Sequence, residues 1–286
     1  MENQEATTTI SASENPALAQ QLIEAALSMS EEEARVVTQP VVQEPLAMEI
    51  TPPPSGNVTL LAGIYDSFNG EHLSTAEIRE LNGIDEEALS KINDYGRGLL
   101  EILKRGVVKI GEKNASSEVL DELLAGDREY LLLKIRIATL GKEISLDGPC
   151  PTCEEKQTYL VDLEEDVKVL KLEDPSETSI NIACKIGEVT VDLPDGKTQK
   201  KLALATNKTV AELDSILLEE CVSLINGAPV LNPKQVKQLG MQDRRTILKE
   251  LAAKNPGPDL SGIVKNCVAC GSEVPLPLTL ADLFRL

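Results

Sequence analysis

The sequence predicts an α+β fold: a helical core, followed by two Cys-x-x-Cys hairpins that an inserted β-meander and further helices separate. Three observations support this prediction. Apolar residues recur at helical spacing through much of residues 75–141. They alternate as in strands at residues 158–163 and 180–193. Two identical cysteine spacings flank the second half of the chain.

Composition limits the classes of ligand. The 286 residues are 42% hydrophobic, which is enough to bury a core. The chain has no Trp, two Phe and four Tyr, so few rings are present for stacking on sugars, bases or flavins. Its net charge of −19 opposes binding to nucleic-acid phosphates. We also expect neither a signal peptide nor a membrane span, because no basic start and no run of 18 apolar residues occurs.

Residues 1–57 are predicted to form an acidic arm and linker. They hold nine acidic residues against one basic residue and end near a Pro-rich run at 52–54. A stripe from Leu18 to Leu27 predicts one amphipathic helix, too small to fold alone. We expect it to dock on a partner; a tail with transient helicity is the alternative.

Residues 58–142 are predicted to be helical. Ser74 and Glu77 have capping-box spacing, which predicts a helix over 75–93, followed by another over 95–105. A second block runs from about 118 to 141, with an interruption expected at Gly126-Asp127, where Gly suits a C-terminal cap and Asp a new N-cap. Its second half is apolar on several faces, which indicates a central buried helix.

Residues 143–163 and 263–286 read as the two halves of a split ribbon. In each half a strand, a cysteine pair and a second strand follow one another, and we expect the first strand to turn at Asp147-Gly148. The intervening residues 164–262 predict a meander of three strands, with a turn at Asp195-Gly196 and the third strand through residues 202–204. Helices are then expected from Thr209, from Asn232-Pro233, and over 242–254.

The cysteines at 150, 153, 267 and 270 form a complete tetrahedral thiolate set. Each two-residue spacer lets both thiolates reach one ion, and four thiolates leave no open coordination position. We therefore predict one structural zinc ion held by Cys150, Cys153, Cys267 and Cys270. Iron in place of zinc, or two redox dithiols, are the alternatives. Gly271 suits the tight turn after the second pair, whereas Glu154 occupies that position in the first.

No catalytic or cofactor-binding residue is predicted. Cys184 and Cys221 lie on apolar faces and are expected to be buried free thiols. His72 is the sole histidine and lies just before a capping-box pattern, so a surface or capping role fits it better than catalysis. The sequence also lacks a phosphate-binding Gly-rich loop that ends in Gly-Lys-Ser or Gly-Lys-Thr.

Several short segments, in order, carry a resemblance to a known family. They are residues 125–137, 140–141, 150–153, 161–163, 193–197, 243–244, 256–259, 270–271 and 283–284. Together they resemble the baseplate (hub) proteins of T-even-type contractile phages and related contractile injection systems. The resemblance does not cover the acidic arm.

The resemblance implies a non-enzymatic structural or assembly component of a contractile tail. Its partners would be other baseplate or tail proteins, in one or several copies per particle, with neither nucleic acid nor a membrane. Synthesis and assembly would take place in the host cytoplasm and the destination would be the virion. We expect residues 18–27 and 276–286 to contact partners; packing on the protein's own core is the alternative for both segments. A zinc-ribbon adaptor in a nucleic-acid process and a thiol redox enzyme are the rival functions.

Overall fold

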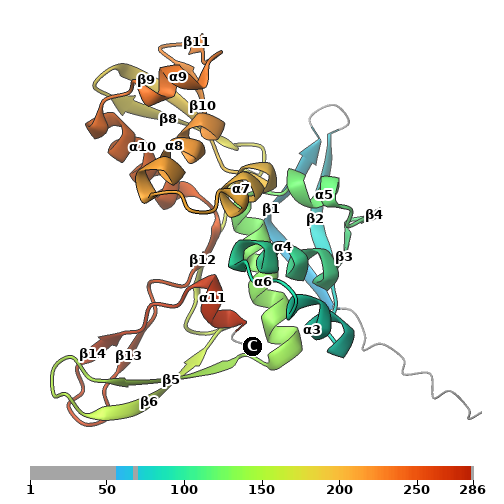
Figure 1. Ribbon diagram of the computed structural model, residues 1–286, viewed down its shortest axis with the longest axis vertical. Coiled ribbons are helices and arrows are strands. Elements are labelled where there is room, and N and C mark those ends of the chain that lie inside the picture. Colours follow the sequence, from blue (N-terminus) through green and yellow to red (C-terminus); the bar gives the residue numbers. More distant parts are fainter. Residues whose placement is uncertain (1–55, 67–69, 285–286) are drawn as a thin grey trace, which may run out of the picture. The chain divides into compact units, whose positions relative to one another are not determined.

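The computed structural model describes residues 56–66 and 70–284, which combine helices and strands (Figure 1). Almost all of the predicted arm, including the helix expected at residues 18–27, lies outside the described residues. Among those that are described, no helix combines the length and the apolar character needed to cross a bilayer.

The first sheet is antiparallel and has the order β1-β2-β3-β4. Its strands are β1 (Gly56–Asp66), β2 (Glu71–Ile78), β3 (Val107–Ile110) and β4 (Lys113–Asn114). The helix predicted over 75–93 is therefore wrong in its first part. Ser74 and Glu77 have the spacing of a capping box, but β2 lies between β1 and β3 and buries Leu73, Ala76 and Ile78. Region 58–142 is thus a sheet with helices, not a helical region.

The first helix of this region begins later than predicted, whereas the second begins where it was expected. Helix α3 (Gly83–Leu89) is capped by Asn82, whose side chain accepts hydrogen bonds from the amides of Ile84 and Asp85. Helix α4 (Tyr95–Gly106) agrees with the prediction for 95–105.

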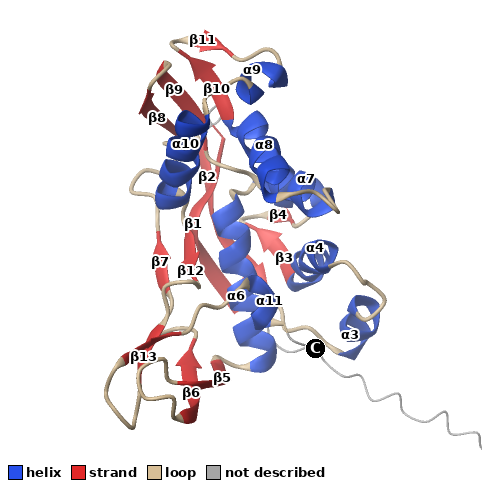
Figure 2. Ribbon diagram, turned by 60° about the vertical axis from the view of Figure 1, so that its left-hand side comes forward, coloured by secondary structure: helices blue, strands red, loops and turns tan. Residues whose placement is uncertain are grey.

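A buried helix, α6 (Ala125–Leu140), connects the cores of the protein (Figure 2). Leu131, Leu132 and Ile135 pack in the core beneath the first sheet, and Leu133 packs in a second core at the base of the cysteine hairpins. The prediction of a central buried helix is confirmed. The break before it is not at Gly126, however, because α5 (Ser117–Glu122) ends earlier and Gly126 belongs to the first turn of α6.

The carboxylate of Asp127 joins the start of α6 to a bulge in β1. It accepts hydrogen bonds from the amides of Leu61 (2.6 Å), Gly63 (2.7 Å) and Ala62, where the pairing of β1 with β2 shifts register. Asp127 is fully buried, and these amides replace the water that it loses. The side chain therefore satisfies backbone donors that the bulge removes from the ladder.

The second sheet has the order β11-β10-β9-β8. Its strands are β8 (Ser179–Cys184), β9 (Gly187–Asp192), β10 (Val222–Ile225) and β11 (Ala228–Pro229). Its core also takes residues from α8 (Val210–Cys221), α9 (Pro233–Lys237) and α10 (Met241–Lys254), which start close to the predicted positions. Of the two thiols expected here, Cys221 is buried and Cys184 is half-buried, and both are free.

The third strand expected at 202–204 is wrong. Those residues belong to α7 (Gly196–Leu204), because Asp195 acts as its N-cap and accepts a 2.8 Å hydrogen bond from the Thr198 amide. The Asp-Gly pair thus starts a helix instead of closing a hairpin. The third strand of the meander is β10, which reaches β9 only after α7 and α8.

Two backbone segments cross closely where α6 meets β12 (Gly257–Asp259), which pairs with β7 (Lys168–Leu170). A Cβ atom on Gly126 would stand 1.4 Å from the carbonyl oxygen of Pro256. Only glycine allows this approach, so the residue read from the sequence as a helix cap is a packing site.

Candidate metal centre

Two hairpins carry the four cysteines, and Figure 1 shows them side by side. The first pairs β5 (Glu143–Pro149) with β6 (Lys156–Asp162) in a continuous register. The second pairs β13 (Val264–Asn266) with β14 (Glu273–Pro275). The turn expected at Asp147-Gly148 is wrong, because both residues belong to β5 and the chain reverses at the cysteine pair itself.

The two cysteine loops share one backbone geometry. The Cys150 amide donates to the carbonyl of Glu155 (2.9 Å), and the Cys267 amide donates to the carbonyl of Ser272 (2.9 Å). In the reverse direction, the amides of Glu154 and Gly271 donate to the carbonyls of Cys150 (2.9 Å) and Cys267 (2.8 Å). The two loops are therefore equivalent. In each, the carbonyl that accepts from the first cysteine's amide lies five positions after that cysteine.

The equivalent residues Glu154 and Gly271 both have a left-handed backbone, with φ of 60° and 75°. Glycine adopts this conformation at little cost, whereas a residue with a side chain does not. The sequence-based expectation that the first loop is the less favourable one agrees with this geometry.

The four sulfur atoms lie close together, and two of the distances between them match those of a tetrahedral site. Cys150 Sγ is 3.7 Å from Cys270 Sγ, and Cys153 Sγ is 3.7 Å from Cys267 Sγ. All four lie within 4.8 Å of one another. Ligands at about 2.3 Å from a tetrahedral zinc ion would stand about 3.8 Å apart. The thiols are too far apart for disulfides, which require about 2.05 Å.

Backbone amides surround the sulfurs and favour the thiolate form. The amides of Cys270 and Ala269 lower the pKa of Cys267 to about 6. The Thr152 amide donates to Cys150 Sγ at 3.4 Å. At Cys153 the Glu155 amide acts in the same direction, but the neighbouring thiols, Cys270 first, raise its pKa to about 12. Four thiols this close cannot all ionise unless a cation compensates their charge.

The hairpins also contact each other outside the sulfurs. Cys150 and Cys267 are buried with Tyr159 and Val274, and Cys153 and Cys270 are exposed. The Val268 amide donates to Gln157 Oε1 at 3.2 Å, which links one cysteine loop to the other hairpin. Each loop thus contributes one inner and one outer sulfur.

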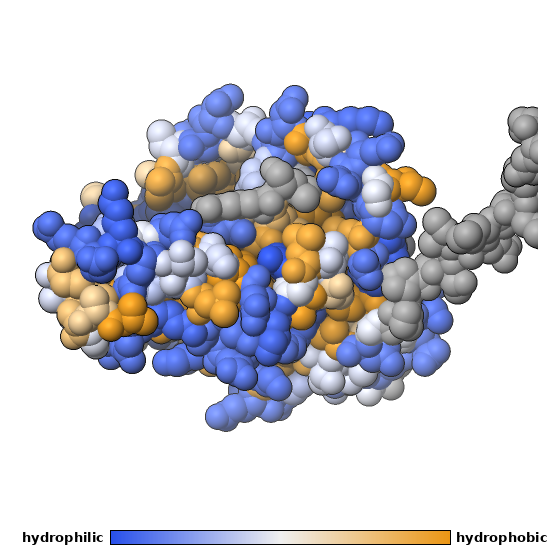
Figure 3. Space-filling model, turned by 90° about the horizontal axis from the view of Figure 1, so that it is seen from below, coloured by the Kyte–Doolittle hydropathy of each residue, from blue (hydrophilic) through white to orange (hydrophobic). Residues whose placement is uncertain are grey.

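The C-terminal segment expected to contact partners packs largely on its own core. Leu278 and Leu283, the latter in α11 (Leu280–Leu283), are buried with Leu133, Val161 and Ile263. Figure 3 shows the lower face of the described chain, where hydrophobic residues form patches interrupted by hydrophilic ones. As far as Phe284, the segment therefore has a structural role.

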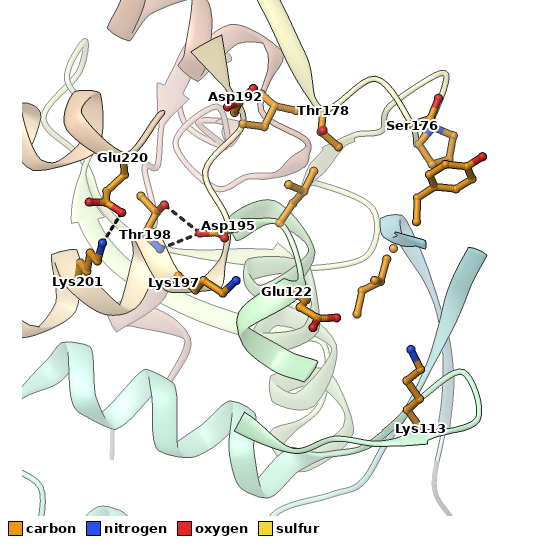
Figure 4. Close-up of a pocket in the computed structure, with 16 residues that line it drawn as sticks. Lys113, Glu122, Ser176, Thr178, Asp192, Asp195, Lys197, Thr198, Lys201 and Glu220 are labelled. Carbon is orange, nitrogen blue, oxygen red and sulfur yellow. Dashed lines mark hydrogen bonds and ion pairs between the residues drawn. The ribbon is translucent and has the colours of Figure 1, made fainter. Parts of the chain in front are cut away.

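An open cleft of about 1040 Å³ lies apart from the cysteines (Figure 4). Lys113, Lys197 and Glu122 line it, together with an ion pair of Lys201 and Glu220 (2.5 Å). None of the described lining residues is a cysteine or a histidine. His72 is not among the lining residues, and its Nε2 is 2.7 Å from the carbonyl oxygen of Ala62, so its ring binds the backbone.

Neither the curated proteins nor the solved structures contain a match to this chain. One family model does match, that of the T4 bacteriophage base plate protein, over residues 72–222. This range covers more than half of the chain and includes Cys150 and Cys153, whereas Cys267 and Cys270 lie beyond it. It also includes helix α6 and the segment at 193–197, two of the pieces that carry the resemblance in sequence. The chain therefore belongs to the T4-type phage baseplate protein family.

Proposed function

We propose that this protein is a non-enzymatic structural component of the baseplate of a contractile phage tail, stabilised by one zinc ion on Cys150, Cys153, Cys267 and Cys270. Family membership supports the baseplate role. The observation that carries the zinc site is the set of sulfur distances, 3.7 Å for two pairs drawn from different hairpins.

The ion would act as a long-range cross-link. Cys153 and Cys267 are separated by 114 positions, so the ion closes a loop that contains the whole region 164–262. By the chain-entropy relation for cross-links, closing a loop of this length contributes about 5 kcal/mol. In this proposal residues 143–163 and 263–286 form one split zinc ribbon, and metal binding is coupled to folding.

A structural role fits the ligand set better than a catalytic one. Four thiolates fill a tetrahedral shell and leave no position for a substrate or a water molecule. Redox dithiols usually lie at the start of a helix, where the dipole lowers the thiol pKa, whereas both pairs here connect antiparallel strands. Zinc is the expected metal, since it is the usual occupant of structural four-thiolate sites.

The partners in this proposal are other tail and baseplate proteins. Assembly would take place in the host cytoplasm, and the protein would become part of the tail baseplate at its hub. The same role in contractile injection systems would follow from the family resemblance. The acidic arm, residues 1–57, is proposed to provide a further contact with a partner.

Complementation of a phage that lacks this protein tests the proposal. A gene that encodes Cys267→Ser is expected to yield protease-sensitive protein and few assembled tails, while Cys184→Ser serves as a control because that thiol is not part of the cluster. Normal tail assembly by a zinc-free Cys267→Ser protein would refute the structural role of the metal. Tails that assemble normally without any copy of the protein would refute the baseplate role.

A further inference from the structure

A small pocket with an excess of positive charge lies between α4, α5, α6 and α7, apart from the cysteines. Its volume is about 200 Å³. The charged residues that line it are four cations, Arg97, Lys104, Arg128 and Lys200, and two carboxylates, Glu101 and Asp121. Because the whole chain carries a net charge of −19, this local excess of cations calls for a specific explanation.

The guanidinium of Arg128 is fixed at the base of the pocket. Arg128 is 2% exposed; its Nη1 donates to the Leu120 carbonyl at 2.6 Å and its Nε donates to Gln199 Oε1 at 2.8 Å. A Cβ on Gly196 would stand 2.5 Å from Nη1, so glycine leaves room for the guanidinium there. Its nearest carboxylate, on Asp121, is 3.6 Å away. A buried cation is thus held in place and only partly compensated.

The carboxylates of the pocket are already matched. Asp121 pairs with Lys200 at 2.9 Å, and Glu101 pairs at 2.6 Å with Arg105, which does not line the pocket. Arg97 and Lys104 form no ion pair with any residue of 56–66 or 70–284. They are exposed and seven positions apart on α4, about 10 Å along its axis. Two uncompensated cations therefore stand at the rim.

The remaining lining is aliphatic. Leu103 and Leu120 are 1% and 4% exposed, and half-buried Leu100 lies beside them. The volume is below the ~300 to 1,000 Å³ of small-molecule sites, but it is large enough for one aliphatic side chain. A free inorganic anion would use the cations and leave this apolar lining unused.

We infer that the pocket binds an acidic polypeptide segment of a partner protein, with carboxylates that meet Arg97 and Lys104 and one aliphatic side chain inserted above the buried Arg128. Charge complementarity supports this occupant, and burial of the aliphatic side chain supplies affinity beyond ion pairing. Nucleic acid is also anionic, but its continuous phosphate charge would be repelled by the acidic remainder of the protein, because the whole chain carries a net charge of −19.

Fluorescence anisotropy with the full chain tests this inference. The probe is a labelled peptide, Glu-Glu-Leu-Glu-Glu, compared with the same peptide carrying Ser at its centre. The Leu peptide should bind saturably and at least fivefold more tightly than the Ser peptide. The double variant Arg97→Glu/Lys104→Glu should weaken binding at least tenfold, because both side chains are exposed and their replacement leaves the core intact. Lys91→Glu, an exposed cation outside the pocket, should leave binding unchanged.

Three outcomes would overturn the inference. The double variant binds the Leu peptide as tightly as the parent protein does, or Lys91→Glu weakens binding of the Leu peptide as much as the double variant does. In the third, inorganic phosphate or a 20-nucleotide single strand binds more tightly than the Leu peptide. The zinc content of each sample is measured in parallel. Since no cysteine lines the pocket, failure here with zinc retained leaves the proposed structural role of the metal untouched.

Discussion

Replacement of Glu154 by glycine should stabilise the protein, because the residue has a left-handed backbone at φ 60° in the first cysteine loop. A non-glycine residue pays about 1 kcal/mol or more for that conformation. Glu154 is exposed and forms no ion pair with the described residues, so the substitution removes no stabilising contact. Part of the gain is lost to the greater freedom of glycine in the unfolded chain. The expected net effect is about 0.5–1 kcal/mol, or roughly 1–3 °C in Tm for a chain of this size.

The equivalent loop provides a matched control. Gly271→Ala places a side chain at φ 75° with nothing within 4 Å of its Cβ, so no steric overlap contributes and the expected net cost is about 0.5–1 kcal/mol in the opposite direction. Glu155→Gly, at an ordinary φ, should destabilise by about 0.5 kcal/mol. Thermal unfolding of the zinc-loaded proteins measures all three. A Glu154→Gly protein that melts at or below the parent temperature would refute the equivalence of the two loops.

Three further perturbations test other parts of the account. Cys150→Ser should lower the free energy of unfolding by about 5 kcal/mol or prevent soluble expression, as urea unfolding would show, and an unchanged midpoint would contradict it. Gly126→Ala should lower the free energy of unfolding by about 3 kcal/mol or more, because its Cβ would overlap the Pro256 carbonyl. Gly98→Ala, in open space within α4, is the control and should raise the free energy of unfolding by about 0.5–1 kcal/mol. Similar effects of the two substitutions would contradict the close crossing of the two backbone segments. Burial raises the pKa of Glu129 from 4.5 to about 7, so the folded state holds its proton to higher pH than the unfolded state does, and stability should fall as pH rises through that window. Glu129→Gln should flatten this dependence, and an equal slope in both proteins would contradict it.

Local chemistry made the cysteine loops predictable. The two-residue spacing, and the glycine after the second pair, identify this geometry without any knowledge of the rest of the fold. Helix α6 can also be predicted from the sequence, because a helix that is apolar on several faces is stable only inside a core.

The errors arose where distant segments decide the local structure. Ser74 and Glu77 match a helix cap, yet pairing with β1 and β3 makes β2 a strand. Asp195-Gly196 matches a hairpin turn, yet the partner strand β10 lies beyond two helices. Gly126 matches a helix cap, but it contacts Pro256, and no local pattern in the sequence reports that contact.

The positive pocket shows the same limit. Its cations come from α4, α6 and α7, which lie far apart in the sequence. Their convergence around Arg128 is a tertiary property. Gly196 is the one residue of the sequence that relates to this convergence, because the absence of a side chain there leaves room for the Arg128 guanidinium. Its position after Asp195, however, predicts a hairpin turn instead.

The central claim is that four thiolates from two distant hairpins bind one metal ion. Elemental analysis of freshly purified full-length protein, together with the absorption spectrum after replacement by Co²⁺, tests it most directly. We predict one zinc per chain and the intense thiolate-to-cobalt and visible bands of a tetrahedral four-sulfur site, both lost in Cys150→Ser. Protein that folds and melts normally with no bound metal, or a cobalt spectrum without four-sulfur character, would contradict the account.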